Sequence, residues 1–291
     1  MVTLLLIACN QEYLLKKHLS SYQRLLKSVN GNIILVDDGS VDRTKEYIHT
    51  HFNSIKYMRN PKEIGYCQSF NTVLPYINTP YFLCVDLHID IHYLPLQETL
   101  SYVQHNHLFM AGFSCSSQQK ISYGYGLCYQ GLNLHLRSLQ KKTACFFSEV
   151  MLLDTKRVLL FNGLSDHYHT LSFSWYDLIF RSVQQGQIIK SFDTCLCQKK
   201  TSQQSVFSYL CDQYSMLKDS FLFQWRFCHS FNFIFKRILS IIFIVLSFNA
   251  FKILHIFQAY FQWLFFTKRY RLNWYSLSEN DIIFQKNSKR S

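Results

Sequence analysis

Two adjacent carboxylates, Asp37 and Asp38, directly follow the apolar run at residues 33–36 and precede Gly39 and Ser40. A short apolar run that stops at turn-forming residues is typical of a buried strand and its exit. A structural interpretation takes the carboxylates as turn formers, with Ser40 as the N-cap of a following helix. Because it explains one carboxylate well and two like charges poorly, we favour a ligand-binding corner.

A second polar series, Asp86, His88 and Asp90, follows the apolar run at residues 81–85. Alternate residues of an extended strand share one face, so we expect these three side chains to point the same way. The alternative is a strand end with a solvated polar face.

The elements that position these residues follow from apolar periodicity. Leu15, Leu19, Tyr22 and Leu26 recur every three or four residues, which predicts an amphipathic helix beginning near residue 13. Further helices are predicted at 42–51 and 66–77, and strands at 3–9, 33–36, 55–58 and 81–85. Strands that alternate with helices favour an α/β fold with a mostly parallel sheet.

A polar residue follows each predicted strand. Asn10 follows the first, Asp37 and Asp38 the second, Asn60 the third and Asp86 the fourth. Ligands of open α/β sheets bind beyond the carboxyl ends of the strands. We therefore predict one ligand site at this edge of the sheet.

The second half of the chain is less regular in its pattern. We interpret "GYGLCYQGLN", within residues 105–150, as turns or a loop over the site, and "FNGLSDHYHT" at 161–170 as a polar loop. Residues 175–187 predict a helix that is closed by Gly186.

Composition bounds the class of protein. The chain has 291 residues, of which 48% are hydrophobic and 16% charged, so it can build a core in one large domain or two modest ones. It has nine glycines and no glycine-rich phosphate loop, which excludes a P-loop or dinucleotide fingerprint. Its ten cysteines include no CxxC pair, which predicts free thiols in a reducing compartment and makes a zinc site improbable.

The formal net charge of +12 is concentrated near the C-terminus, where residues 218–291 hold eleven Lys and Arg against three Asp and Glu. Asn249 and Lys252 interrupt the aromatic and aliphatic residues there. The uninterrupted apolar run is therefore shorter than the about twenty residues that a membrane-spanning helix needs. We favour one or two helices on an anionic membrane surface, over a buried helical cap or a transmembrane helix. The charge lies among Phe and Ile rather than along a polar groove, which argues against a nucleic-acid partner.

The order of several motifs resembles a family 2 glycosyltransferase with the GT-A nucleotide-sugar-binding fold, over roughly residues 2–195. The motifs are "VDDGSVDRT" at 36–44, "NPKEIGYCQSFN" at 60–71, "FNGLSD" at 161–166 and "DLIFRSVQQG" at 177–186. The resemblance implies a GT-A-type, mostly parallel sheet flanked by helices, followed by a helical, aromatic-rich, basic extension. It divides the chain into a catalytic domain at 1–200 and a membrane-associating region at 201–291.

The resemblance also assigns a nucleotide site. Asp38 would accept the base N–H, Asp37 would support the turn or the ribose, and Gly39 would allow a tight turn. Asn71 matches the family pattern and is expected to cap or pack rather than to bind. The residues implied are Ala8, Asn10, Asp37, Asp38, Gly39, Asn60 and Gly65.

In the family an acidic motif after the fourth strand holds a divalent cation, which neutralises the diphosphate leaving group. Here the matching residues are Asp86 with His88, or His88 with Asp90. The implied cofactor is Mn²⁺ or Mg²⁺, and an imidazole ligand favours Mn²⁺.

The general base of an inverting sugar transfer is harder to place. Ser174 and Trp175 stand where the family has Glu and Asp, although Asp177 matches. Asp177 is one candidate base, and Asp166 and His167 of the preceding loop are others. Asp177 could instead serve only as a cap or a salt-bridge partner.

The resemblance therefore implies transfer of a sugar, with inversion, from a nucleotide-diphospho-sugar to a glycan or lipid-linked saccharide. The expected location is the cytoplasmic face of a membrane, in the assembly of a cell-surface glycan. The missing acidic pair keeps open a non-catalytic GT-A protein that binds a nucleotide sugar or acts as a scaffold at the membrane. A nucleotidylyltransferase is disfavoured because "ACNQEYLLKKH" contains no glycine.

Overall fold

The computed structural model describes most of the first two thirds of the chain and short pieces of the remainder. It divides into two compact units: Met1–Tyr125, Ser138–Ser165 and Leu178–Thr201 form the first, and Gly126–Arg137, Asp166–Asp177 and Ser202–Ser291 the second. The domain boundary expected at residue 200 stays a prediction. The residues described are 1–117, 120–122, 125–130, 133–138, 148–193, 196–199, 215–216, 218–223, 226, 257 and 259–260.

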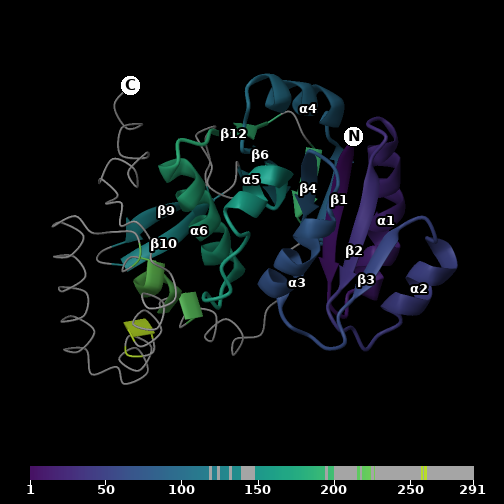
Figure 1. Ribbon diagram of the computed structural model, residues 1–291, viewed down its shortest axis with the longest axis horizontal. Helices are drawn as coiled ribbons and strands as arrows, with labels where there is room; N and C mark the ends of the chain where they lie inside the picture. Colours follow the sequence, from purple (N-terminus) through teal and green to yellow (C-terminus); the bar gives the residue numbers. More distant parts are fainter. Residues whose placement is uncertain are drawn as a thin grey trace. The chain divides into compact units, whose positions relative to one another are not determined.

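A seven-stranded sheet, in the order β12-β6-β11-β4-β1-β2-β3, forms the centre of the first unit (Figure 1). β1 runs parallel to β2 and β4, β2 is parallel to β3, and β11 is antiparallel to both of its neighbours. The α/β fold with a mostly parallel sheet is therefore confirmed. The strands are β1 Val2–Ala8, β2 Asn32–Asp37, β3 Lys56–Arg59, β4 Tyr81–Val85, β6 Met110–Phe113, β11 Val150–Asp154 and β12 Ile189–Phe192.

Helices flank this sheet on both faces, as Figure 1 shows. The predicted helices near residues 13, 42 and 66 are confirmed within a few residues, and so is the helix that ends before Gly186. The helices are α1 Glu12–Lys27, α2 Thr44–His51, α3 Tyr66–Val73 with the 3₁₀ turn η1 Leu74–Tyr76, α4 Leu96–His105, α5 Thr155–Leu160 and α6 Leu171–Gln184.

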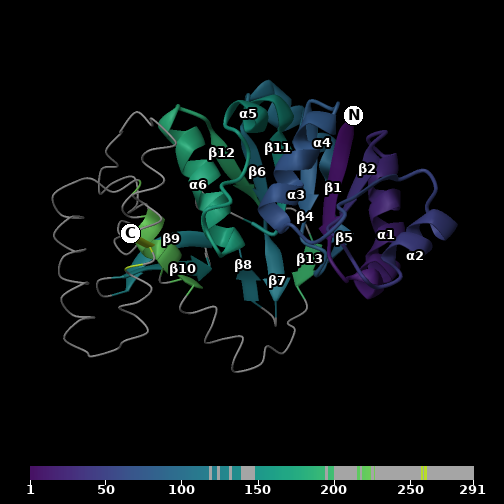
Figure 2. The same ribbon diagram turned by 60° about the horizontal axis from the view of Figure 1, so that its bottom comes forward.

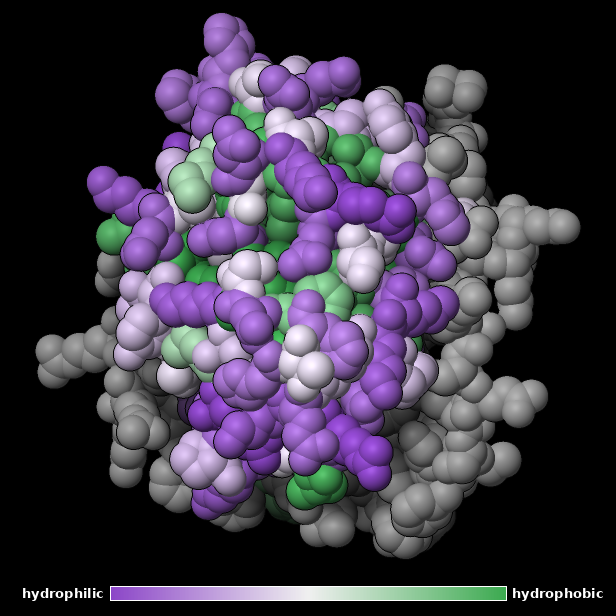
Figure 3. Space-filling model, turned by 90° about the vertical axis from the view of Figure 1, so that its right-hand side faces the viewer, coloured by the Kyte–Doolittle hydropathy of each residue, from purple (hydrophilic) through white to green (hydrophobic). Residues whose placement is uncertain are grey.

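The central strands form because their apolar runs are covered on both sides. β1, β2 and β4 read VTLLLIA, NIILVD and YFLCV, and nearly all of these residues are buried. Continuous apolar runs of this kind are typical of parallel strands between helical layers. α1 adds Leu15, Leu19, Tyr22 and Leu26 to the same core. The side that α1 and α2 cover is mostly hydrophilic at its surface (Figure 3).

The middle of the chain contains strands, so the prediction of turns or a loop is wrong for residues 125–130. β9 Tyr125–Gln130 pairs with β10 Asn133–Ser138. The glycines of this stretch read as turn signals, but pairing between strands overrides local preference. A further four-stranded sheet (Figure 2), in the order β5-β13-β7-β8, contains β5 Ile89–Tyr93, β13 Leu196–Lys199, β7 Cys115–Ser117 and β8 Lys120–Ser122.

In the second unit, the start of α6 packs against residues of the C-terminal region. The ring of Phe223 lies 5.8 Å from that of Phe173 and 6.5 Å from that of Tyr176, measured between centroids. Part of the C-terminal region therefore packs into a core with α6. Asn249, Lys252 and most of the predicted membrane-associating segment lie outside the described residues.

Within the part of the chain that the structure describes, no helix is both long enough and apolar enough to cross a lipid bilayer.

Candidate functional site

The carboxyl ends of the parallel strands bring the predicted polar residues to one edge of the sheet. Ala8 at the end of β1 lies opposite Asp37 of β2, and the backbone N–H of Asp38 donates to the Ala8 carbonyl at 2.8 Å. The N–H of Asn60, beyond β3, donates to the Asp37 carbonyl at 2.9 Å. Asp86 follows directly on β4, which runs parallel to β1. The corner after β2 is the centre of this arrangement.

Asp37 is fully buried and stabilises the corner from beneath. One carboxylate oxygen accepts the backbone N–H of Ser40 at 2.8 Å, and the other accepts Nη1 of Arg59 at 2.8 Å and the hydroxyl of Tyr57. The second guanidinium nitrogen of Arg59 donates to the Ser40 carbonyl at 2.7 Å. The geometry fits support of the turn, the first of the two roles expected for Asp37.

Sequence reasoning missed Tyr57 and Arg59, although they are two residues apart in β3 and so share a face. Burial, followed by the hydrogen bond to Asp37, raises the pKa of Tyr57 to about 12. Tyr57 therefore remains a neutral hydrogen-bond donor at physiological pH.

Asp38 joins the corner to the loop at residues 60–65. Oδ1 accepts Nδ2 of Asn60 at 2.8 Å and the N–H of Ile64 at 3.0 Å, while Oδ2 accepts the N–H of Gly65 at 2.9 Å. Burial alone would raise the pKa of Asp38, but hydrogen bonds from Ile64, Asn60, Ser69 and Gly65 outweigh it and lower that pKa.

The donors around Asp38 limit what else it can bind. A carboxylate has about four lone-pair sites, and Asn60, Ile64 and Gly65 already donate to this one. Asp38 is also only 3% exposed. Its predicted contact with a nucleobase stays a prediction.

Gly39 and Gly65 are needed for the loop to cross the corner. Gly39 has φ +70°, and a Cβ there would lie 2.3 Å from the backbone N of Glu63. Gly65 has φ +91°, which strains any residue that carries a side chain. The two glycines therefore permit the close approach of this loop to the end of β2.

Asn10 ties the end of β1 to the same corner. Its Oδ1 accepts the N–H of Val41 at 2.8 Å, and its own N–H donates to Oγ of Ser40 at 3.0 Å. Asn10 has φ +54°, a left-handed conformation that asparagine tolerates better than most residues. It is exposed at the edge where a ligand would bind.

The N-cap role suggested for Ser40 is wrong. α2 begins at Thr44, and Arg43 before it provides no side-chain cap. Asp42 is closer to the helix start, and its carboxylate accepts the N–H of Thr44 at 3.0 Å and that of Glu12 at 3.0 Å. This leaves the Ser40 hydroxyl for its contact with Asn10.

Cys9 and Glu63 are two ionisable residues near the corner to which the sequence assigned no role. Burial, followed by the negative charges of Glu63 and Asp38, raises the pKa of the Cys9 thiol. The end of β1 therefore lies in a negative field beside the predicted nucleotide corner.

The predicted common face of Asp86, His88 and Asp90 is wrong, because the chain turns between β4 and β5. Oδ1 of Asp86 accepts the N–H of His88 at 2.9 Å and lies 3.0 Å from its Nδ1, and the N–H of Ile89 donates to the Asp86 carbonyl at 2.9 Å. An Asp side chain that bonds the backbone two residues ahead favours such a turn over a continued strand.

Asp90 consequently faces α1 rather than Asp86. Its Oδ1 lies 3.7 Å from Nδ1 of His18, and its Oδ2 lies 3.8 Å from Nζ of Lys17. Of the two pairings that the sequence left open, the structure brings together Asp86 and His88.

Asp86 and His88 form a small donor set for a cation. Their side chains are 42% and 34% exposed. Among the described residues, no group of three or more His, Cys, Asp or Glu side chains could hold a metal ion. A carboxylate and an imidazole fit a cation that takes its other ligands from a diphosphate and water, as Mg²⁺-type sites do.

The loop that leads to Asp166 is held by side chains from α3 and α6. Nδ2 of Asn71 donates to the Leu164 carbonyl at 2.7 Å, and its Oδ1 accepts the Leu164 N–H at 2.8 Å. Arg181 donates to the carbonyls of Phe161 and Gly163, the latter at 2.8 Å. These contacts fit the expectation that Asn71 caps or packs rather than binds.

The three candidate bases lie in the second unit, in contrasting surroundings. Asp177 is fully buried, and its Oδ1 lies 2.5 Å from Nη1 of Arg226 and 3.4 Å from the Tyr168 hydroxyl. Asp166 is 49% exposed and His167 31% exposed, with 3.8 Å between Oδ1 and Nε2. The salt-bridge interpretation of Asp177 fits its surroundings, whereas Asp166 is exposed and Nε2 of its neighbour His167 is buried.

Asp219, which sequence reasoning also missed, holds the segment before α6. It accepts the N–H of His169 at 3.1 Å and the N–H and hydroxyl of Thr170 at 2.6 and 2.8 Å. A residue of the C-terminal region thus satisfies donors at the start of α6, as an N-cap does.

The fold is similar to that of several solved structures. Mannosyltransferase PcManGT from Pyrobaculum calidifontis, in complex with GDP-Man and Mn²⁺, matches with a TM-score of 0.57 and 13% identity, over 93% of this chain and 76% of that one. Residues 1–349 of S. aureus TarS match with a TM-score of 0.53 and 13% identity, over 76% and 64%. In complex with UDP-GlcNAc, TarS 1–349 matches at 0.54 and 12% identity, over 76% and 66%.

This chain therefore spans less than two thirds of that first TarS chain. At these identities the likeness shows the GT-A fold alone. No curated protein is detectably similar to the chain in sequence.

The family itself is shown by a sequence comparison. Residues 3–162 match the family described as glycosyl transferase family 2. That range contains the strand-end corner, the loop at 60–65 and the Asp86–His88 pair. Because the match covers more than half of the chain, the protein belongs to glycosyl transferase family 2.

Proposed function

We propose that the protein transfers a sugar, with inversion, from a nucleotide-diphospho-sugar to a glycan or a lipid-linked saccharide. The observation that carries the proposal is the corner built around Asp38, at the sheet edge where α/β proteins bind ligands, with Asp86 and His88 at the end of β4. The UDP-GlcNAc and GDP-Man complexes of TarS and PcManGT support a nucleotide-sugar donor.

The nucleoside would lie against the corner. Asp37 and Asp38 keep the turn and the loop at 60–65 in place, and the exposed Asn10 borders the site. Ala8, Gly39, Asn60 and Gly65 contribute through their backbone or through their contacts to Asp38. We assign these residues to the positioning of the donor.

Asp86 and His88 would hold the divalent cation. A bound cation would neutralise the charge that develops on the diphosphate as the sugar departs. The imidazole favours Mn²⁺ over Mg²⁺, and the Mn²⁺ in the PcManGT complex is consistent with this choice. Asp90 is not part of the proposed set, because it faces Lys17 and His18.

A base must take the proton from the acceptor hydroxyl. Asp177 is poorly suited, because its carboxylate is paired with Arg226 and is fully buried. The exposed Asp166 is the better candidate, with His167 beside it. We therefore assign proton abstraction to the Asp166–His167 pair.

The basic C-terminal region supports a location on the cytoplasmic face of a membrane. Its excess of Lys and Arg among aromatic and aliphatic residues suits an anionic lipid surface. A lipid-linked or surface glycan acceptor would then lie at the same membrane surface as the protein.

A second candidate function is a non-catalytic protein that binds a nucleotide sugar or serves as a scaffold. Ser174 and Trp175 stand where the family has an acidic pair. Asp177, which matches the family motif, forms an ion pair with Arg226. Both observations favour the non-catalytic protein, because they remove the usual candidates for the general base.

The deciding experiment combines binding and turnover with the full chain. UDP-, GDP- and dTDP-sugars are titrated in Mn²⁺, and hydrolysis and transfer to lipid-linked and free saccharides are followed. We expect one nucleotide class to bind and to turn over. Binding without turnover for any donor would support the non-catalytic protein, and no binding at all would refute the transferase and leave only the scaffold.

A further inference from the structure

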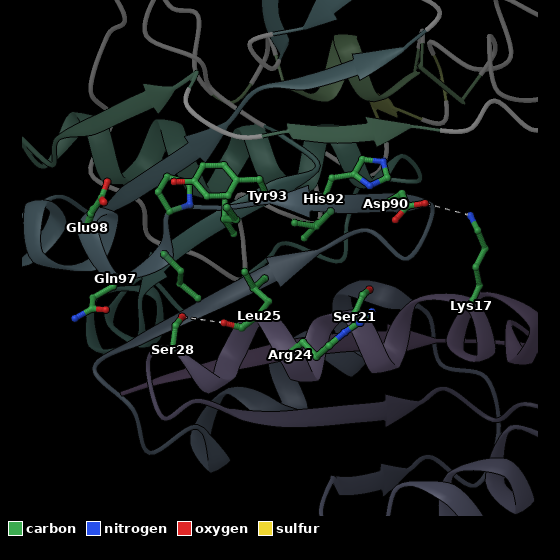
Figure 4. Close-up of a pocket in the computed structure, with 14 residues that line it drawn as sticks. Lys17, Ser21, Arg24, Leu25, Ser28, Asp90, His92, Tyr93, Gln97 and Glu98 are labelled. Carbon is green, nitrogen blue, oxygen red and sulfur yellow. Dashed lines mark hydrogen bonds and ion pairs between the residues drawn. The ribbon is translucent and has the colours of Figure 1, made fainter.

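A groove of about 760 Å³ lies along α1, on the side where β5 leads into α4. One wall is formed by α1 and the other by the end of β5 and the start of α4 (Figure 4). The groove lies within the first unit.

The α1 wall presents one stripe of polar side chains. Lys17, Ser21, Arg24 and Ser28 are spaced by three or four residues, so they lie on one face of the helix. Their eleven-residue span corresponds to about 16 Å along the helix axis. The stripe is therefore long enough to contact an extended ligand at several points.

This wall offers both kinds of hydrogen-bonding group. Lys17 and Arg24 are donors. The hydroxyls of Ser21 and Ser28 already donate to the carbonyls of His18 and Leu25, at 2.6 and 3.0 Å, so their oxygens keep only acceptor capacity.

The opposite wall carries acceptors and an aromatic ring. Asp90 and Glu98 supply carboxylates, and Gln97 supplies an amide. Tyr93 is 52% exposed, and Figure 4 shows its ring in this wall across from α1. A tyrosine ring combines an apolar face with a polar hydroxyl.

The charges of the groove are balanced, and Nζ of Lys17 lies 3.8 Å from Oδ2 of Asp90 in the opposite wall. Lys17 and Arg24 on one wall balance Asp90 and Glu98 on the other. An anion would meet the two carboxylates, and a cation would meet the ammonium and guanidinium groups. A neutral, hydroxyl-rich ligand avoids both, because each hydroxyl can donate to one wall and accept from the other.

We propose that this groove binds a neutral oligosaccharide, with a sugar ring stacked on Tyr93 and hydroxyls bonded to Arg24 and Glu98. Asp90 lies on β5, which directly follows the Asp86–His88 turn, so one end of the groove is close in sequence to the proposed cation site. The ligand is then a non-reacting part of the acceptor glycan, an assignment that rests on the proposed function.

The test measures binding of the full chain to an array of neutral and acidic oligosaccharides, followed by calorimetric titration of the best neutral one. We expect the wild type to retain a neutral oligosaccharide, and Tyr93→Ala and Arg24→Ala each to weaken it by about tenfold or more. Tyr93→Phe keeps the ring and should bind nearly as the wild type does.

Two substitutions outside the groove serve as matched controls. Tyr76→Ala removes an aromatic ring of the same 52% exposure, and Lys27→Ala removes an exposed cation from α1. Both should leave the oligosaccharide affinity unchanged. Thermal unfolding of each variant separates lost binding from lost folding.

Three outcomes would overturn the proposal: retention of no neutral oligosaccharide, retention of acidic glycans alone, or binding that Tyr93→Ala and Arg24→Ala leave intact. Nucleotide-sugar binding is measured in the same variants and should not change. If the oligosaccharide binds while no nucleotide sugar does, the proposed function fails and the groove remains a saccharide site.

Discussion

At the scale of single residues, Asp38 and Asp37 have different tasks although they are neighbours. Asp37 holds the turn after β2 through Ser40, Tyr57 and Arg59. Asp38 holds the loop at 60–65 because its carboxylate accepts the backbone N–H groups of Ile64 and Gly65. Strand alternation explains the difference, because successive side chains leave a strand on opposite sides.

Asp38→Asn tests the role of this carboxylate. The amide keeps the shape but loses the charge and one acceptor, so the N–H of Ile64 or that of Gly65 loses its partner. Hydrogen bonds to a charged group are worth about 1.5–3 kcal/mol, so we expect a loss of stability of roughly that size. Nucleotide affinity should fall about tenfold or more, by titration calorimetry.

Asp42→Asn is the matched control, because Asp42 lies in the same turn and its hydrogen bonds also lower its pKa against the effect of burial. It should reduce stability without a comparable loss of nucleotide affinity. An Asp38→Asn protein that binds nucleotide as tightly as the wild type would refute the corner as the nucleotide site.

The lowered pKa of Asp38 also predicts a dependence of stability on pH. A carboxyl group whose folded pKa is below its unfolded value, about 3.9, stabilises the protein fully above that value and loses this contribution as pH falls through the folded pKa. Urea unfolding between pH 6 and 2.5 should show a smaller decline for Asp38→Asn than for the wild type. Equal declines would contradict this assignment.

At the scale of elements, the loop at 161–165 and the start of α6 depend on distant side chains. Asn71 of α3 and Arg181 of α6 hold the loop, and Asp219 satisfies the N–H groups before α6. These contacts connect residues far apart in the chain, so local sequence carries no direct signal of them.

Asp219→Ala should loosen the start of α6. Three hydrogen bonds to His169 and Thr170 are lost, and removal of a capping acceptor typically costs about 0.5–2 kcal/mol. Hydrogen exchange should accelerate at the amides of residues 169–172. Unchanged exchange there would show that the contact does not stabilise the helix start.

Asp177→Asn and Asp166→Asn separate a structural carboxylate from a catalytic one. Removing one partner of a buried ion pair costs about 3–5 kcal/mol, so Asp177→Asn should strongly reduce stability because Arg226 loses its counterion. Asp166 is exposed, so its substitution should change stability by less than about 0.5 kcal/mol and should abolish sugar transfer.

Chemical denaturation and initial rates of transfer measure the two effects. A stable Asp177→Asn protein without turnover, together with an active Asp166→Asn protein, would reverse the assignment of the base.

At the scale of the whole molecule, the charge distribution predicts where the protein works. The full chain should sediment with vesicles that contain anionic lipid and not with neutral vesicles, and added salt should release it, because salt screens charges over about 8–10 Å. Vesicles that carry phosphatidylserine provide the test. Equal binding to neutral vesicles would favour an apolar interaction, and no binding would refute a membrane-surface location.

By itself, the sequence determined the α/β class, the central strands, the helices α1, α2, α3 and α6, and the strand-end corner. These follow from apolar runs, helical periodicity and turn residues, which are local signals. The tertiary structure decided which carboxylates are paired within the protein, because that depends on partners brought from elsewhere in the chain. Asp37 meets Arg59, Asp177 meets Arg226, and Asp90 turns away from Asp86.

The strands of the middle region were also decided by the tertiary structure, because a strand gains its backbone hydrogen bonds only from a partner strand. A helix satisfies its backbone within one segment and can be read from that segment. Local signals, an apolar run followed by turn residues, made the corner after β2 predictable. The groove beside α1 was not predictable, because its two walls come from separate segments of the chain.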